Sequence, residues 1–241
     1  MAGHNKWSKI KRDKGVNDAK RGAVFTKIGN MIAIAARAGT DPTMNSALAL
    51  AIEKARQANM PKDNIQRSID RAADKNAAQL EEITYEGYGP GGVGIIIETA
   101  TDNKNRTYPE VRTALTKNGG TMADPGSVMF QFTRKGVIRV AATGEEALLT
   151  VLDAGAEDAA EEDEGLTVYT DMKDLAKVRQ AIVDAGLTVD DAELQYVPNS
   201  HVAIDDAEIA RKIMKILDAL DDVDDVVNVH TNADIQDEID E

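Results

Sequence analysis

Cysteine is absent from this chain of 241 residues, and aromatic residues make up only 4% of it. The absence of cysteine excludes disulfides, thiolate-bound zinc, iron–sulfur clusters and cysteine nucleophiles. It is consistent with a reducing compartment. Because aromatics are scarce, the hydrophobic cores must be built mainly from Ala, Val, Ile and Leu, and apolar residues reach 42% of the chain.

Long hydrophobic runs are also missing. The longest apolar stretches, residues 31–36 and 47–52, are too short to span a bilayer, which takes about 20 residues. The N-terminus carries positive charge without an apolar segment behind it, so we do not expect a secretory signal. The sequence therefore predicts a cytoplasmic protein with no membrane partner.

Recognisable catalytic and cofactor motifs are scarce as well. The three histidines, His4, His201 and His230, have no metal-ligand spacing. Residues 87–92 match G-x-G-x-x-G, but we expect a strand after them, whereas a dinucleotide site needs a helix N-terminus there. We interpret this segment as a tight, glycine-rich entry to a strand. The sequence thus predicts no enzyme activity, no catalytic residue, no cofactor and no metal site.

Charge is segregated along the chain. Residues 1–75 contain 15 Lys and Arg against 7 Asp and Glu, residues 76–140 contain 7 of each kind, and residues 141–241 contain 6 against 28. The formal net charge of −14 therefore hides a basic front end. A basic segment joined to an acidic body is typical of a protein that meets a polyanion at one end.

Candidate nucleic-acid contacts follow from this distribution. Residues 1–16 are basic and lack helical periodicity, which predicts an arm whose cations neutralise phosphates and whose tryptophan stacks on a base. The alternative is a solvated tail, or one folded onto the acidic body. Arg106 is expected at a helix N-terminus, which suits a phosphate, although turn and capping chemistry explains the same pattern equally well. The predicted nucleic-acid-binding residues are Lys6, Trp7, Lys9, Lys11, Arg12, Lys14, Lys20, Arg21, Lys27 and Arg106.

Three short amphipathic helices are predicted after the arm. The first ends at Gly39, Asp41 is expected to cap the second (about 43–58), and Pro61 opens the third. Five cations of these helices lie largely off the apolar stripes: Lys54, Arg56, Lys62, Arg67 and Arg71.

Strand and helix patterns alternate downstream. Capping boxes predict helix starts at Thr107-x-x-Glu110 and Thr143-x-x-Glu146, and Asp205 is expected to cap a later helix. Strands are expected at 93–100, 128–132, 136–140, 166–170, 193–197, 201–204 and 225–230, with a weak acidic strand at 156–162.

This order predicts an α+β protein of several domains. Residues 136–198 run β-α-β-β-α-β, the ferredoxin-like pattern, and are expected to form an inserted acidic domain. Residues 76–135 with 199–241 are expected to form a second ferredoxin-like α/β domain, which is discontinuous. Residues 1–75 are expected to form the basic arm and a three-helix domain.

Four segments resemble the YebC/PmpR family, in order and at matching spacings. They are residues 1–8 (MAGHNKWS) with Lys11, residues 18–27 (DAKRGAVFTK), residues 85–92 (YEGYGPGG) and residues 102–107 (DNKNRT), and the match extends to Gly119-Gly120 and Gly126-Ser127-Val128. Asn5 stands where the family pattern has Ser. The resemblance covers essentially the whole chain. It implies a cytoplasmic protein with a helical N-terminal domain and two α/β domains, one of them discontinuous.

The resemblance leaves two functions open. Members are usually described as DNA-binding transcriptional regulators, while others, including mitochondrial relatives, are described as translational activators at the ribosome. Some bacterial members are linked to relief of stalling on proline-rich stretches. The Ala-rich second helix, with Lys54 and Arg56 as its long donors, does not resemble a major-groove reader. A basic arm with a glycine-rich loop suits structured RNA instead.

We therefore predict a non-enzymatic, nucleic-acid-binding regulator of gene expression, whose partner is DNA, or rRNA or tRNA on the ribosome. The acidic region has three alternatives: it faces solvent, contacts basic ribosomal proteins, or keeps the protein off non-specific nucleic acid. A protein-binding adaptor is the third class of function, and it leaves the basic arm unexplained.

Overall fold

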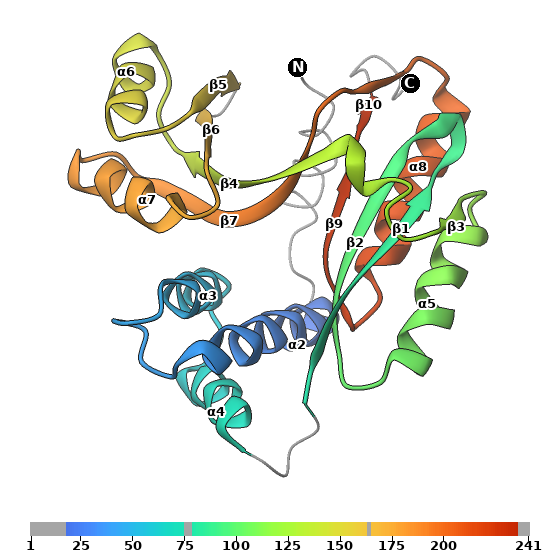
Figure 1. Ribbon diagram of the computed structural model, residues 1–241, viewed down its shortest axis with the longest axis horizontal. Coiled ribbons are helices and arrows are strands. Elements are labelled where there is room, and N and C mark those ends of the chain that lie inside the picture. The colour runs from blue at the N-terminus through green and yellow to red at the C-terminus, as the bar shows by residue number, and fades with distance from the viewer. Residues whose placement is uncertain (1–17, 75–78, 163–164, 236–241) are drawn as a thin grey trace.

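The computed structural model describes residues 18–74, 79–162 and 165–235. Figure 1 shows three parts: a helical unit at the lower left, a sheet of long strands with helices at the right, and a second sheet with its own helices at the upper left. The mixed α+β class predicted from the sequence is confirmed.

The helical unit consists of α2 (Asp18–Ala35), extended by the 3-10 helix η1 (Ala36–Ala38), then α3 (Ser46–Gln57) and α4 (Lys62–Ala73). Gly39 ends the first helix and Pro61 precedes the third, as predicted. The three helices pack together because each carries an apolar stripe at helical spacing. Their shared core contains Ile28, Ile32, Ala36, Leu48, Ile52, Ala55, Met60, Ile65 and Ile69.

The start of α3 differs from the prediction. Asn45, rather than Asp41, is the N-cap, and its side-chain oxygen accepts a hydrogen bond from the backbone nitrogen of Leu48 at 3.1 Å. Its amide nitrogen donates to the backbone carbonyl of Ala35, the last residue of α2, at 2.8 Å and to that of Gly39 at 2.7 Å. Asp41 instead accepts a hydrogen bond from the backbone nitrogen of Thr43 at 2.9 Å, which closes a turn. Asn45 suits the N-cap position because its side-chain oxygen accepts a hydrogen bond from the helix while its side-chain nitrogen holds the residues before the helix.

The first sheet contains β1 (Glu81–Tyr88), β2 (Gly94–Thr101), β3 (Thr121–Ala123) and β9 (Val226–Thr231), all antiparallel to their neighbours, in the order β3-β1-β2-β9. The helices α5 (Lys104–Thr116) and α8 (Ala207–Asp221) pack on one face. β2 is the strand predicted at 93–100. The sequence pattern does not predict β1, because Glu86 and Gly87 interrupt its alternation. The buried core contains Ile95, Ile97, Val111, Leu115, Ile213, Ile216, Leu217, Leu220, Val226 and Val229.

The helix α5 begins earlier than its capping box predicts. Asn103 is the N-cap, and its side-chain oxygen accepts hydrogen bonds from the backbone nitrogens of Asn105 and Arg106 at 3.2 and 3.3 Å. Thr107 is buried inside the helix, where its hydroxyl donates to the carboxylate of Asp225 at 2.6 Å. A partner far along the chain therefore decides the role of Thr107, and a local motif does not contain that information.

A strand is predicted at residues 128–132, but residues 128–131 form a turn and only Phe132 belongs to a strand. The 3-10 helix η3 (Met129–Gln131) occupies this position, and β4 (Phe132–Val140) begins after it. The backbone nitrogens of Val128 and Met129 donate to the carboxylate of Glu86 at 2.6 and 2.8 Å, so a side chain takes the hydrogen bonds that a strand neighbour would receive.

The second sheet contains β4, β5 (Asp158–Glu162), β6 (Gly165–Thr170) and β7 (Val189–Pro198), in the antiparallel order β5-β6-β4-β7. With α6 (Glu145–Asp153) and α7 (Leu175–Asp184), the chain order is β-α-β-β-α-β, the predicted ferredoxin-like pattern. The weak acidic strand is present as β5. The capping prediction at Thr143 is wrong, because α6 starts after Gly144, with φ 91°, and no side chain caps it.

Residues 199–235 add one strand to the first sheet and form a separate two-stranded sheet. β8 (Val202–Ile204) pairs in parallel with β10 (Ala233–Ile235), and α8 and β9 lie between them in the chain. Asp206, not Asp205, caps α8, since its carboxylate accepts hydrogen bonds from the two backbone nitrogens of Glu208 and Ile209 at 2.7 and 3.0 Å. The first sheet thus uses segments from both sides of the second. The boundaries 1–75, 76–135 with 199–241, and 136–198 stay a prediction.

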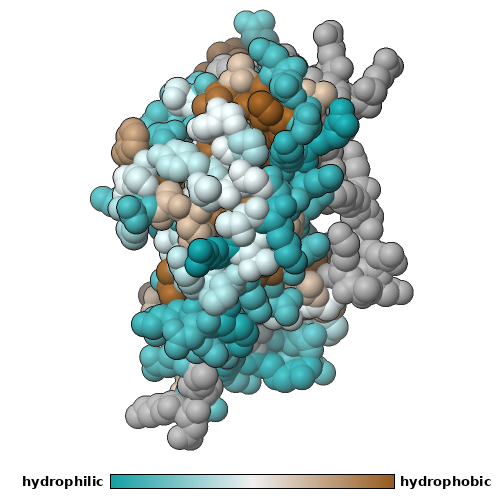
Figure 2. Space-filling view, turned by 90° about the vertical axis from the view of Figure 1, so that its right-hand side faces the viewer, coloured by the Kyte–Doolittle hydropathy of each residue, from teal (hydrophilic) through white to brown (hydrophobic). Residues whose placement is uncertain are grey.

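The outer surface beside α5 and α8 is mostly hydrophilic. Figure 2 shows this side of the molecule, and the hydrophobic side chains on it form separate spots. The charged residues of the two helices lie on the side away from the sheet, as expected for amphipathic helices. Within the described part of the chain, no helix combines the length and hydropathy needed to cross a membrane.

Candidate nucleic-acid interface

The N-terminal candidates are only partly covered by the structure. Lys20 and Arg21 belong to the first turn of α2. The arm candidates lie outside the described residues: Lys6, Trp7, Lys9, Lys11, Arg12 and Lys14. Their contact with nucleic acid stays a prediction from the sequence.

Lys27 is tied to the C-terminal end of α8. Its ammonium group donates to the backbone carbonyl of Asp221 and lies 3.3 Å from Oδ1 of the same residue. Only 11% of the Lys27 side chain is exposed. Cations are stabilised beside the carbonyls that end a helix. Lys27 therefore joins α2 to α8, and a phosphate would have to displace this contact in order to bind it.

Arg106 lies in the first turn of α5, where the sequence places it. Its guanidinium reaches the carboxylate of Asp225 at 2.8 and 2.9 Å and that of Asp102 at 3.2 Å. Hydrogen bonds and charge from these two carboxylates raise the pKa of Arg106 above its ordinary value. Asp225 is buried and also accepts hydrogen bonds from the hydroxyls of Thr101 and Thr107. The turn is thus held by its own network, and the 47% of the Arg106 side chain that is exposed is what a phosphate could reach.

Exposed cations line a groove on the helical unit. Arg56 of α3 and Lys62 of α4 are both exposed, and they border a groove of about 490 Å³ between the two helices. Asp70 is the one acid among the residues that line it. Cations at the edge of a groove can neutralise backbone phosphates without reading bases. The predicted binding residues omit Arg56 and Lys62, although their positions off the apolar stripes signal their exposure.

The inward-facing cations of the helical unit bind the rest of the protein instead. Arg71 lies 3.5 Å from Asp102. Lys54 contacts the carboxylate of Glu193 on β7 directly and lies 3.9 Å from that of Asp191. Among the five cations that lie off the apolar stripes, Arg56 and Lys62 are thus exposed at the groove. Lys54 and Arg71 instead face inward and are paired with acids from other parts of the protein.

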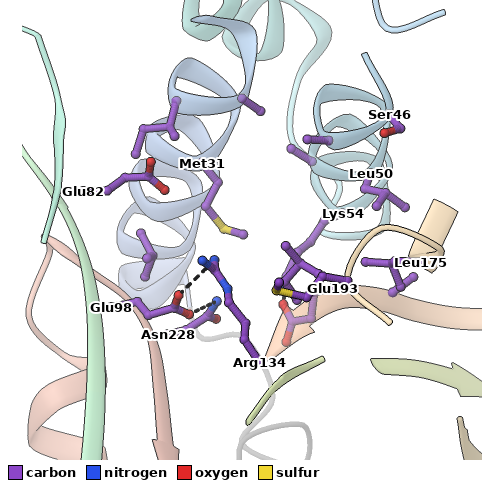
Figure 3. Close-up of a pocket in the computed structure, with 18 of the residues that line it drawn as sticks. Met31, Ser46, Leu50, Lys54, Glu82, Glu98, Arg134, Leu175, Glu193 and Asn228 are labelled. Carbon is purple, nitrogen blue, oxygen red and sulfur yellow. Dashed lines mark hydrogen bonds and ion pairs between the residues drawn. The ribbon is translucent and has the colours of Figure 1, made fainter. Parts of the chain in front are cut away.

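A cleft of about 410 Å³ lies where the helical unit meets both sheets. Figure 3 shows Met31 and Leu50 from the helical unit and Leu175 from α7 around it, with Lys54 and Glu193 inside. The lining is partly aliphatic, and the Lys54–Glu193 ion pair crosses from α3 to the second sheet. The cleft is thus a boundary between parts of the protein, with its central charges already paired.

A polar network on the wall of this cleft joins the two sheets. His230 is buried on β9, and its Nε2 lies 2.9 Å from the carboxylate of Glu98 on β2. Asn228 and Arg134 approach the same carboxylate at 3.3 and 3.4 Å, as Figure 3 shows. Arg134 also lies over the ring of Tyr196, 5.4 Å from its centre. Since Arg134 and Tyr196 belong to the second sheet, this network fixes how the sheets meet.

The glycine-rich segment connects two strands, since β1 ends at Tyr88 and β2 begins at Gly94. Gly91 has a φ of 78°, which favours glycine. A Cβ on Gly87 would lie 2.9 Å from the Leu115 side chain and 3.0 Å from the carbonyl of Thr121. The segment therefore forms a tight turn and a close packing contact, in agreement with our interpretation of it as an entry to a strand. Across the described residues, no cluster of His, Asp or Glu is placed to hold a metal ion.

Two family profiles together match most of the chain. The family profile described as "TACO1/YebC protein N-terminal domain" matches residues 5–75, and the one described as "TACO1/YebC second and third domain" matches residues 80–233. The chain belongs to the TACO1/YebC family. The resemblance seen in the four sequence segments is thereby confirmed.

Relatives in this family match the chain over nearly its full length. A protein of Roseiflexus castenholzii is 48% identical over 251 residues, covering 100% of this chain and 98% of its own, and one of Thermobifida fusca is 49% identical over 245 residues, covering 99% and 98%. Both are named "Probable transcriptional regulatory protein". The crystal structure of a conserved hypothetical protein from Aquifex aeolicus is 40% identical, with a TM-score of 0.87 over 93% of this chain and 94% of that one.

We expect acid to weaken the contact between the helical unit of this TACO1/YebC protein and its second sheet. Burial alone would raise the pKa of Glu193, but the charge of Lys54 and hydrogen bonds from Lys54 and Gln195 outweigh it and lower the pKa from 4.5 to about 2. Because folding lowers this pKa, the stabilisation is complete above about pH 4.5 and is lost as the pH falls towards 2. It amounts to roughly 3 kcal/mol.

Lys54→Met measures this contribution, because it leaves Glu193 without its cation. The wild type should be more stable than the variant by roughly 3 kcal/mol near pH 6, and the difference should shrink towards zero near pH 2 as Glu193 becomes protonated. Denaturant unfolding across this range is the measurement, with the exposed Lys177→Met as the matched control. A difference that does not change with pH would contradict the assignment.

Proposed function

We propose that this protein is a non-enzymatic, nucleic-acid-binding regulator of gene expression that contacts its partner through residues 1–75. The observation that carries the proposal is the segregation of charge, with 15 Lys and Arg against 7 Asp and Glu in residues 1–75 and 6 against 28 in residues 141–241. Such a chain is attracted to a polyanion at one end and repelled at the other, so its orientation on nucleic acid is set by charge. The groove beside Arg56 and Lys62 adds exposed cations to the basic end.

A DNA-binding transcriptional regulator is the first form of this proposal. Its support is the name "Probable transcriptional regulatory protein" carried by relatives about 48% identical to the chain. Phosphate contacts from a basic arm position a protein on DNA without reading its sequence. In this form, base readout comes from a surface other than α3.

A ribosome-associated translation factor is the second form, and the geometry of α3 favours it. Lys54 is held by Glu193, which leaves Arg56 as the exposed long cation of this helix. A recognition helix needs several long donors that reach base edges together. Structured RNA is recognised largely by shape and backbone contacts, for which an arm and a cationic groove suffice. In this translational form, the acidic second sheet would face basic ribosomal proteins or solvent.

Crosslinking in cells followed by sequencing of the bound nucleic acid tests both forms. Discrete promoter peaks without cosedimentation with ribosomes would support DNA-binding regulation. Recovery of rRNA or tRNA without promoter enrichment would support the translational form. A variant with the basic arm neutralised is the control, and it should lose the crosslinks in either case. If the wild type and the variant both recover nucleic acid only at the background level, the proposal as a whole is overturned.

A further inference from the structure

Phe130 is an exposed aromatic side chain on the connection between the two sheets. It lies in η3 and is 72% exposed, whereas its neighbours Val128 and Phe132 are buried against Ile96 at 0% and 7% exposure. The chain contains only three phenylalanines. A polar residue at this position would make the same turn without exposing an apolar ring to water. Packing therefore does not account for a phenylalanine here.

One buried carboxylate anchors the loop that carries Phe130. Glu86 on β1 accepts hydrogen bonds from the backbone nitrogens of Gly126, Val128 and Met129 at 2.5, 2.6 and 2.8 Å. Burial by itself would raise the pKa of Glu86, but these three hydrogen bonds outweigh it and lower the pKa. The carboxylate is thus ionised at neutral pH and acts as a three-point anchor for the loop.

Further hydrogen bonds hold the loop on both sides of the ring. The hydroxyl of Tyr88 donates to the carbonyl of Ser127 at 2.7 Å. The side-chain amide of Asn199 donates to the carbonyl of Phe130 at 3.3 Å, and its backbone nitrogen donates to that of Gln131 at 2.8 Å. The backbone around the ring is therefore ordered before any partner arrives, which lowers the entropy cost of a contact made there.

The segment around Phe130 carries few charges. Asp124 is the only acid in residues 120–135, and the two cations that close this stretch are paired, Arg134 with Glu98 at 3.4 Å and Lys135 with Glu157 at 3.3 Å. Most acids of the chain lie beyond it, in residues 141–241. An exposed ring on an ordered backbone, in a segment with a single acid of its own, is the arrangement on which unpaired bases stack.

We propose that Phe130 is a stacking platform for an unpaired base of single-stranded nucleic acid. This inference rests on the proposed function and adds to it a specific contact outside the basic arm. RNA and unpaired DNA both supply such a base, and a perfect duplex does not, because its bases are already stacked. The contact is apolar and aromatic, so it contributes to affinity without adding to the salt dependence that cations create.

The test uses full-length protein and three probes: a 12-nucleotide RNA with a central 2-aminopurine, its DNA counterpart, and a blunt DNA duplex. Phe130→Ala and Phe130→Leu should each lower the affinity for the single strands about tenfold, while Phe130→Tyr restores it. Binding to the duplex and the salt slope should stay unchanged. Quenching of 2-aminopurine fluorescence should be lost in the Ala and Leu variants. The difference between the RNA and DNA probes identifies the source of the base.

Leu149→Ala is the matched control, because Leu149 is 55% exposed on α6 in the acidic region, outside the proposed interface, and should leave all three affinities unchanged. The Phe130 variants should unfold at the wild-type denaturant midpoint, since the ring makes few contacts. If Phe130→Leu binds the single strands like wild type, the aromatic face is not used, Phe130 belongs to an apolar protein contact instead, and the inference is overturned. If wild type binds none of the three probes, the proposed function itself fails.

Discussion

Replacing Lys9, Lys11, Arg12 and Lys14 together by alanine should reduce the slope of log K against log salt by about 3.6 on duplex DNA and about 2.8 on a single strand. Each cation that neutralises a phosphate releases condensed counterions, and duplex DNA releases more of them per contact than a single strand does. At about 0.1 M salt the loss of affinity should reach roughly three orders of magnitude. Fluorescence anisotropy over a range of salt concentrations measures both quantities.

A control variant separates specific contacts from net charge. Alanine at Lys173, Lys177, Arg211 and Lys215 removes the same number of positive charges from exposed positions in the acidic half of the chain. This variant should keep the wild-type slope, since these cations lie among acids that repel phosphates. If both variants lower the slope equally, binding follows overall charge and the arm is not the interface. If the arm variant keeps the wild-type slope, the contact lies elsewhere, for example in the groove beside Arg56 and Lys62.

Glu86→Ala should lower the free energy of unfolding by about 3–5 kcal/mol. The substitution leaves the backbone nitrogens of Gly126, Val128 and Met129 without their acceptor, and an unsatisfied buried donor costs about 1–3 kcal/mol. The donors near the surface regain water, which places the expected cost below the sum of three fully buried donors. A loss of this size is a large share of the stability of an ordinary protein. Urea unfolding followed by circular dichroism measures it.

Glu86→Gln and Glu110→Ala are the controls for this prediction. The amide of Gln keeps one acceptor oxygen but points donors at other donors, so its cost should be intermediate. Glu110 is exposed on α5, and its removal should change the free energy of unfolding by less than about 0.5 kcal/mol. Because the pKa of Glu86 is lowered in the folded state, the gap between wild type and Glu86→Ala should narrow as the pH falls below 4.5. A loss below about 1 kcal/mol for Glu86→Ala would show that the loop does not depend on this carboxylate.

Local patterns predicted the elements well where neighbours in sequence decide the structure. The helical stripes, the buried strand at 93–100 and the β-α-β-β-α-β order of residues 136–198 all depend on the period of apolar side chains, which any short window contains. The capping boxes failed because a Thr-x-x-Glu match is only one option for a threonine. In the folded chain the hydroxyl of Thr107 donates to the carboxylate of Asp225, and Asn103 is the N-cap of α5.

The cations of the candidate site also show that distant partners decide what a local pattern cannot. Lys27 and Arg106 look alike in sequence to the cations of the arm, yet in the folded chain they meet Asp221 and Asp225, more than 100 residues away. Lys54 likewise meets Glu193. Partners at such separations are chosen by the packing of sheets and helices, so no local pattern reveals which cations are paired and which stay exposed.

The sequence by itself determined the segregation of charge, the exclusion of cysteine chemistry, the mixed α+β class and the family resemblance, because these follow from composition, periodicity and short motifs. Only the tertiary structure decided that Arg56 and Lys62 line an open groove, that Glu86 anchors the loop at residues 126–129, and that Phe130 is exposed on the same connection. Each of these depends on the contact of β1 with a loop about 40 residues later, or of one helix with another. Such contacts exist only once the hydrophobic cores have brought the elements together.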